Sequence, residues 1–228
     1  MKVTKEKSAE NRLALVETAA RLFRERGIDD VGVAEISKAA GLTHGALYGQ
    51  FPSKQALVAE ALAHGMAASQ AYMTAPKPHG APTLSDQLNL YLSLDHRDNL
   101  AGGCAMAASA SEIGRQDEAT SARLAVGFEQ MVGSVQAALE ATTPTADARA
   151  RALTIAAAMI GGVAMARAAA KSRPDLSDEI MTAVRRVLGE VGGEDGERGT
   201  EVVSAAAAGK GGRSSSNRGR ASNNRSSP

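Results

Sequence analysis

Several residue types are scarce in this chain, and each scarcity excludes a class of protein. Only one cysteine occurs among the 228 residues, which excludes an internal disulfide framework and a cysteine-rich zinc module. Tryptophan is absent, and three Phe and three Tyr leave the core to Ala, Leu, Val, Ile and Met. Alanine favours helix over strand. The composition therefore predicts an all-α protein that works in the reducing environment of the cytoplasm.

Long apolar runs are also missing. The longest one, residues 155–166, is well short of the roughly 20 residues that a membrane span needs. The charged segment 1–11 is not followed by the apolar run of a signal peptide. Lys and Arg number 26 against 25 Asp and Glu, so the formal net charge is +1. We expect no membrane partner, and any patch that attracts nucleic acid has to be local.

Apolar residues recur with helical spacing over most of the chain. The spacing predicts helices over 11–26, 33–40, 43–51, 54–72, 84–94, 104–115, 118–141, 146–171 and 176–190. Pro and Gly within 75–82 predict a linker. From residue 192 onward Gly, Ser, Asn and Arg replace large apolar residues, which predicts a disordered basic tail. Such a tail would either add salt-sensitive affinity for DNA or only keep the chain in solution.

Residues 33–54, with the sequence VAEISKAAGLTHGALYGQFPSK, carry the most informative pattern. Two short helices with Gly41 between them fit a helix–turn–helix, because glycine adopts the left-handed backbone of such a turn cheaply. Ile36 and Leu47 are expected to point inward. The outer face of the second helix then carries His44, Gly45, Tyr48, Gly49 and Gln50. That face suits close approach to a duplex, although the same pattern also fits two helices of an ordinary bundle.

Short motifs follow one another at fixed spacing between residues 20 and 57. They are Phe23 and Gly27, then Ile36-Ser37-Lys38-Ala39-Ala40-Gly41-Leu42, then Gly45-Ala46-Leu47-Tyr48-Gly49-Gln50-Phe51, then Ser53, Lys54 and Leu57. In this order, residues 11–62 resemble the N-terminal DNA-binding domain of TetR-family transcriptional regulators. Two positions depart from the family pattern, because Gly32-Val33 stand where Ser or Thr is usual and Ser37 replaces Ala.

The resemblance implies a recognition helix that enters the major groove of a palindromic double-stranded DNA operator. By this likeness, Tyr48 donates its hydroxyl to a phosphate and Lys54 meets another at a helix N-terminus. His44 and Gln50 are the implied readers of base edges. The implied DNA-binding residues are Thr43, His44, Gly45, Ala46, Tyr48, Gly49, Gln50 and Lys54.

The resemblance also implies the domain organisation. A three-helix DNA-binding domain over 8–54 is expected to precede a larger helical domain over 55–191 for ligand binding and dimerisation, followed by the tail over 192–228. A pocket for an unidentified small-molecule effector is implied among the middle helices. Its expected lining is Met66, Met73, Tyr91, Cys104, Met106, Phe128 and Met131. Ordinary core packing is the other interpretation of these residues.

Two C-terminal segments are apolar enough to form a homodimer interface. One helix–turn–helix contacts too little DNA for high specificity, so such proteins usually bind as pairs. The predicted interface residues are Ile155, Met159, Gly162, Val163, Val184, Val187 and Leu188. The same stripes would also serve an internal core.

Cys104 follows two glycines at a predicted helix start, where the helix dipole favours negative charge. It is interpreted either as a redox- or electrophile-sensing thiol or as a small buried hydrophobe.

No catalytic or metal-binding pattern is found in the sequence. The four His lack metal-ligand spacing, and neither a phosphate-binding glycine loop nor Gly-x-Ser-x-Gly occurs. We therefore expect no enzyme, no cofactor and no metal. The predicted function is that of a homodimeric, sequence-specific DNA-binding regulator, a repressor released by a small molecule. The alternative is a helical ligand-binding or protein-interaction protein whose helix–turn–helix does not read DNA.

Overall fold

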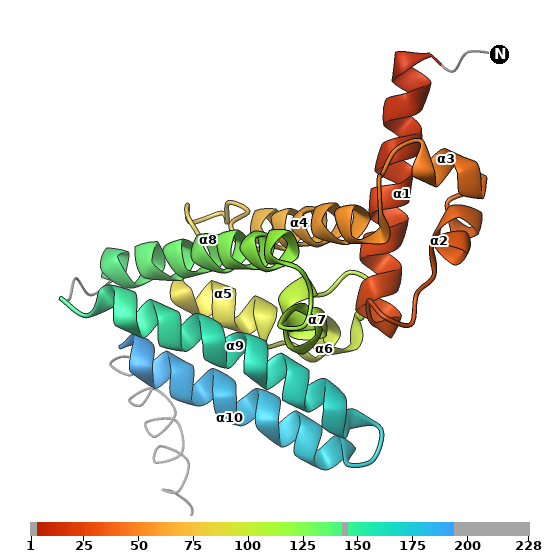
Figure 1. Ribbon diagram of the computed structural model, residues 1–228. Coiled ribbons are helices and arrows are strands. Elements are labelled where there is room, and N and C mark those ends of the chain that lie inside the picture. The colour runs from red at the N-terminus through yellow and green to blue at the C-terminus, as the bar shows by residue number, and fades with distance from the viewer. Residues whose placement is uncertain (1–3, 143–145, 194–228) are drawn as a thin grey trace, which may run out of the picture. The chain divides into compact units, whose positions relative to one another are not determined.

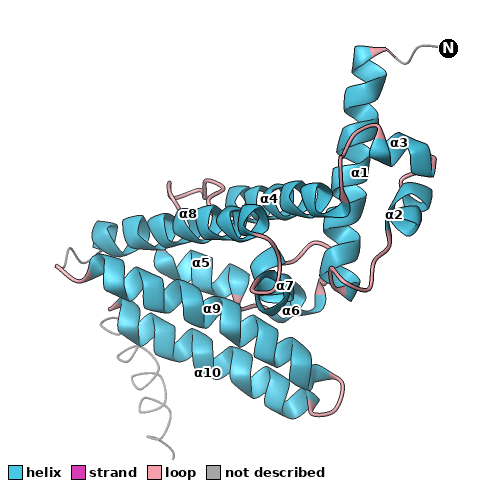
Figure 2. Ribbon diagram, viewed as in Figure 1, coloured by secondary structure: helices cyan, strands magenta, loops and turns pink. Residues whose placement is uncertain are grey.

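The computed structural model describes residues 4–142 and 146–193 and contains ten α-helices and no strand within these ranges (Figures 1 and 2). In chain order they are α1 (Lys5–Arg26), α2 (Val33–Ala39), α3 (His44–Tyr48), α4 (Lys54–Met73), α5 (Leu84–Tyr91), α6 (Leu94–Asp98), α7 (Ala105–Ile113), α8 (Glu118–Thr142), α9 (Ala148–Ala170) and α10 (Pro174–Gly192). The prediction of an all-α fold is confirmed. The predicted tail, apart from its first two residues, lies outside the described residues.

Capping side chains explain where the helices differ from the predicted bounds. α1 begins earlier than predicted, because the Thr4 hydroxyl accepts a hydrogen bond from the Lys7 amide at 3.2 Å. The predicted helix over 84–94 is two helices, since Ser93 caps α6 and its hydroxyl oxygen accepts from the His96 amide at 3.1 Å. Such caps satisfy amides that have no partner within the helix. α3 is also shorter than the predicted 43–51 and ends at Tyr48.

The predicted linker over 75–82 contains a tight turn. Lys77 and Gly80 exchange two backbone hydrogen bonds of 2.8 and 2.9 Å. Directly after the turn, Thr83 and Asp86 form a capping box at the start of α5, in which each side chain accepts from the other residue's backbone amide. The linker therefore ends in a fixed helix start.

One hydrophobic core runs through the described helices. Leu15 of α1, Leu57 of α4, Val132 of α8 and Ile155 of α9 are all fully buried in it. α4 packs on both α1 and α8, and α9 lies between α8 and α10 (Figure 1). Because α4 belongs to both groups of helices, it connects the N-terminal helix–turn–helix domain rigidly to the larger C-terminal domain. The division after residue 54 falls at the first residue of this shared helix and remains a prediction.

α9 is the one described helix whose length and composition alone would allow it to cross a membrane. Its apolar character has another explanation in the fold. Ala152, Ile155, Met159 and Val163 are fully buried against neighbouring helices, so the helix supplies core side chains that a soluble fold also needs.

Candidate nucleic-acid interface and ligand cavity

The α2–α3 segment has the geometry of a helix–turn–helix. Gly41, between the two helices, has φ +70°, a left-handed conformation that residues with a Cβ adopt only at a cost. The Leu42 amide donates to the Ser37 carbonyl at 2.8 Å across the turn. Ile36 and Leu47 are completely buried and pin α2 and α3 to α1. The predicted turn and its inward-facing residues are thus confirmed.

The outer face of α3 is small and open. The Thr43 hydroxyl accepts from the Ala46 amide at 3.3 Å and caps the helix. Tyr48 is 50% exposed, and its ring meets His44 edge-on with centroids 5.0 Å apart. No atom lies within 4 Å of the place where a Cβ on Gly45 would stand. This face presents one aromatic hydroxyl, one imidazole and bare backbone to solvent.

Two of the predicted DNA-binding residues are engaged inside the protein. The Gln50 side-chain amide donates to the Ser8 hydroxyl at 2.8 Å, and Gln50 follows α3 rather than belonging to it. The Lys54 ammonium donates to the Ile28 carbonyl at 2.6 Å. Their assignment as DNA-binding residues remains a prediction. Gln50 joins the end of α3 to α1, and Lys54 joins the start of α4 to the segment after α1.

Sequence analysis missed the residue that holds α3 in place. Arg12 of α1 donates to the Gln50 carbonyl, pairs with Glu60 of α4, and places its guanidinium 4.1 Å from the centre of the Phe51 ring. An Arg stacked on an aromatic face while bound to a carboxylate is held in one geometry. Its position on α1, amid other charged residues, gave no signal, because all three partners are far away in sequence.

Two family models match the chain. The model described as bacterial regulatory proteins of the tetR family covers residues 15–61, which include α2 and α3. The model described as the LmrA/YxaF-like transcriptional regulator C-terminal domain covers residues 90–176. The chain belongs to the TetR family. This family consists of transcriptional regulators and not of enzymes, in agreement with the expectation from the sequence.

Relatives and solved structures agree with this TetR-family assignment. The HTH-type transcriptional regulator AcrR of Shigella flexneri is 40% identical over 57 residues, which are 25% of this chain and 26% of AcrR. The chain thus spans about a quarter of the length of the curated relatives that it matches. A TetR-family regulator from Cytophaga hutchinsonii has a similar fold, with a TM-score of 0.67 and 20% identity over 83% of this chain and 98% of that one. The structure of NemR from E. coli in its reduced form has a TM-score of 0.64 and 21% identity, over 79% of this chain and 96% of NemR.

A cavity of about 580 Å³, called the large cavity below, opens among the described helices of this TetR-family chain. It is lined by α4, α5, α6 and the loop that precedes α7. Of the seven predicted pocket residues, only Met73 and Tyr91 line it. Met66, Cys104, Met106 and Met131 surround a separate void of about 10 Å³, which holds at most one water molecule. Phe128 packs against the core and lines neither space.

Cys104 is buried at the N-cap of α7. Its Sγ accepts from the Ala107 amide at 3.5 Å, and only 1% of the residue is exposed. Burial and the cap interaction fit the interpretation of a small buried residue. The interpretation as a sensing thiol remains a hypothesis.

Tyr91 and His96, which line the large cavity, form a group of polar side chains with Arg167 of α9. The rings of Tyr91 and His96 lie with centroids 4.7 Å apart, and Arg167 of α9 donates to the His96 carbonyl at 3.0 Å. Burial raises the pKa of the Tyr91 hydroxyl well above its ordinary value. Burial, and next the charge of Arg167, lower the pKa of His96 to about 4. Near neutral pH the group therefore holds a protonated phenol, a neutral imidazole and a guanidinium.

The predicted interface residues are divided between the core and the surface. Ile155, Met159, Gly162, Val163 and Leu188 are buried within the single chain, so the internal-core interpretation holds for them. Helix packing within the chain covers that face of α9, and the prediction that these five form an interface is corrected. Val184 is half-buried against Gly162, and Val187 is 42% exposed.

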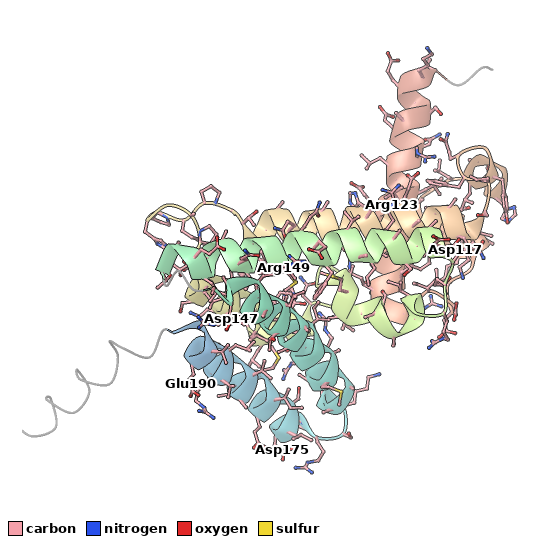
Figure 3. All side chains as sticks on the ribbon, turned by 60° about the vertical axis from the view of Figure 1, so that its left-hand side comes forward. Asp117, Arg123, Asp147, Arg149, Asp175 and Glu190 are labelled. Atoms are coloured by element: carbon pink, nitrogen blue, oxygen red, sulfur yellow. The ribbon has the colours of Figure 1, made fainter. Side chains whose placement is uncertain are left out.

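The faces of α9 and α10 that point away from the core are apolar and exposed. On α9, Ala157, Gly161 and Met165 share one face at helical spacing, and Met165 is 61% exposed. On α10, Leu176 and Val187 are exposed on a face that also carries Ile180 and Ala183. Asp175 and Glu190, near the two ends of α10, are labelled in Figure 3. Large apolar side chains gathered on one face are typical of a protein-binding surface.

Two hydrogen bonds connect the end of α1 to the C-terminal domain. The Ile28 amide donates to the Glu112 carboxylate of α7 at 2.7 Å, and Arg24 donates to the Ala101 carbonyl at 2.7 Å. Ala101 lies in the same loop as Asn99 and Gly102, which line the large cavity. The loop that forms part of the cavity wall is therefore hydrogen-bonded to α1, the helix that supports α2 and α3.

Proposed function

We propose that the chain is a cytoplasmic, homodimeric, sequence-specific DNA-binding repressor that a small molecule releases from its operator. The open face of α3 carries this proposal. A short capped helix with exposed Tyr48 and His44, a bare Gly45 and a rigid support fits the recognition element of a helix–turn–helix in a major groove. The membership of the TetR family supports the same activity.

The proposed DNA contacts come from α3 and its cap. Thr43 and Tyr48 are assigned to phosphates, and His44 to a base edge. Gly45, Ala46 and Gly49 are assigned to close approach, with the Ala46 methyl available to a thymine methyl. Gln50 and Lys54 act indirectly in this proposal, by fixing the orientation of α3 and α4.

The test measures the affinity of the chain for DNA fragments selected from its own genome. Tyr48→Phe removes only a hydroxyl, and we expect affinity to fall about fivefold, the value of one phosphate hydrogen bond. Thr182→Val is the control, because it also removes one exposed hydroxyl, on α10 of the C-terminal domain and away from the proposed effector site. Footprinting should show a protected inverted repeat. No protected repeat, or equal losses in both variants, would contradict DNA reading by α3 and favour the alternative of a protein that does not read DNA.

The proposed dimer pairs the exposed faces of α9 and α10 from two copies into a four-helix bundle. A two-fold axis fits this arrangement because the same patch then meets itself. Met165→Glu places a charge on the exposed apolar face of α9, and we expect monomers in sedimentation analysis. Thr182→Glu is the control, since Thr182 is exposed on the other side of α10. A dimer that survives Met165→Glu would contradict this interface.

The proposed effector site is the 580 Å³ cavity. Its volume lies in the range of small-molecule sites, and its loop adjoins the hydrogen bonds of Arg24 and Ile28. A ligand that displaces this loop or α7 would change the support of α1. Release of operator DNA on ligand binding tests this part, and ligand-enhanced DNA binding would contradict repression by the free protein.

A further inference from the structure

Several buried polar atoms without a hydrogen-bond partner belong to Tyr91 and His96, which line the large cavity, and to Arg167, which donates to the His96 carbonyl. Within residues 4–142 and 146–193, five buried side-chain polar atoms lack a hydrogen-bond partner, and three of them are the Tyr91 hydroxyl, His96 Nε2 and Arg167 Nη1. Buried polar atoms nearly always have partners, so each exception requires an explanation. Three exceptions in one place suggest a shared missing partner.

The chemistry of these groups defines that partner. A guanidinium has only donors, and the protonated Tyr91 phenol, whose one neighbouring side-chain partner is the weakly hydrogen-bonding Cys104 thiol, offers its O–H to a stronger acceptor. The neutral His96 ring can also present an N–H, depending on its tautomer. The other two Arg167 nitrogens are already used, since Nε donates to the Arg97 carbonyl at 2.8 Å and Nη2 to the His96 carbonyl at 3.0 Å. The free positions therefore call for an acceptor.

The local charge favours an anionic acceptor. Arg24 and Arg167 are both more than half buried, and no carboxylate among the described residues lies within 4 Å of either guanidinium. Burial lowers the pKa of both side chains, which is the sign of uncompensated positive charge. Asp95 also lines the cavity, but it is exposed, and water screens exposed charges far more than buried ones.

The backbone next to Arg167 is adapted to the guanidinium. A Cβ added to Gly103 would overlap both Arg167 Nη2 and the Asn99 carbonyl oxygen, so a larger residue there would displace the arginine or the loop backbone. Gly102, the preceding residue, lines the cavity. The wall between the cavity and Arg167 thus consists of glycine backbone together with the Tyr91 and His96 rings, both of which line the cavity.

We infer that the cavity binds an effector with an acidic head group, a carboxylate or a similar oxyanion, which accepts hydrogen bonds from Tyr91 and His96 and is attracted by the positive charge of Arg167 behind their rings. The inference rests on the proposed function only in naming the ligand an effector. The apolar body of the molecule would lie toward Met73, Leu90 and Tyr72, on the remaining wall.

The test compares three probes with the same ring system and different charge. Binding of 2-naphthoate, 2-naphthamide and 2-naphthylmethylamine to the full chain is measured by calorimetry in the absence of DNA. We expect the acid to bind at least tenfold tighter than the amide, because charge-assisted hydrogen bonds are about twice as strong as neutral ones. Equal affinities for acid and amide, tighter binding of the amine, or no saturable binding of any probe would overturn the inference.

Two variants locate the acid group. Tyr91→Phe should weaken 2-naphthoate about fivefold and leave 2-naphthamide unchanged, while the unfolding free energy stays constant or rises, because a buried hydroxyl without a partner is removed. Arg167→Gln should abolish the preference for the acid. Arg149→Gln is the control, since Arg149 is an exposed arginine near the start of α9 that pairs with Glu129 at 2.9 Å (Figure 3).

A preference for the acid that survives both Tyr91→Phe and Arg167→Gln would place the anion elsewhere and overturn the assignment. The outcome for DNA is separate. A chain that binds 2-naphthoate selectively but protects no operator would support the acidic ligand and contradict the proposed repressor function.

Discussion

The partly buried His96 side chain should make the stability of the protein fall between pH 7 and pH 5. Its folded pKa of about 4 lies below the ordinary value of about 6.5. A folded pKa below the unfolded one means that the unfolded chain takes up the proton first as the pH falls. The contribution is thus complete above pH 6.5 and is lost progressively as the pH falls toward 4.

The magnitude follows from these two pKa values. Each pH unit within the window changes the free energy of unfolding by about 1.4 kcal/mol, so the step from pH 7 to pH 5 costs at most about 2 kcal/mol. The ring is only partly buried, and solvent screening reduces the expected loss to about 1–2 kcal/mol.

Urea unfolding at both pH values checks this expectation, with His96→Gln as the variant and the same protein concentration throughout. The difference between wild type and variant isolates His96 from the carboxylates, which titrate in both proteins. Between pH 7 and pH 5 we expect the free energy of unfolding of the wild type to fall by about 1–2 kcal/mol more than that of the variant. A difference that is the same at pH 7 and pH 5 would refute the buried, neutral imidazole.

Three further predictions concern stability. Gly41→Ala should lower the free energy of unfolding by about 1 kcal/mol or more and weaken DNA binding, because a residue with a Cβ is strained at φ +70° although the site has room. Chemical denaturation measures the loss of stability, and an unchanged midpoint would contradict the strained turn. Leu15→Ala should cost about 2–5 kcal/mol, as the side chain is fully buried in α1; a loss under about 1 kcal/mol would mean that the core collapses onto the cavity. The Thr83 hydroxyl and amide lower the pKa of Asp86 to about 2, so its contribution is present above about pH 4 and lost toward pH 2. Asp86→Asn should cost about 1 kcal/mol at pH 7 and less at pH 3, and a cost that grows on acidification would refute the cap.

Local features of the fold could be predicted from the sequence because their causes lie within a few residues. Gly41, Thr43 and Ser53 each determine a turn or a helix start through their own backbone conformation or hydroxyl group. The division between α5 and α6 was missed for a related reason. Apolar spacing continues across Ser93, and only its cap hydrogen bond shows that one helix ends and another begins.

Features that depend on distant partners could not be predicted. α9 is apolar on nearly all sides, so its sequence does not distinguish the face that meets α8 and α10 from the face that meets solvent. Ile155 is therefore in the core and Met165 outside it. Gln50 and Lys54 bind partners 42 and 26 residues away, and the cavity contains polar residues of α6 where methionines were expected.

The hydrogen bond between the Ile28 amide and Glu112 has a practical consequence. The Ile28 amide proton lies just after α1, the helix that supports α2 and α3, and its hydrogen-bond acceptor is a carboxylate of the C-terminal domain. The exchange rate of this proton with deuterated solvent therefore reports the contact between the two domains. Slow exchange corresponds to closed contact, and each increase in rate on adding a compound or DNA reports how often that contact opens.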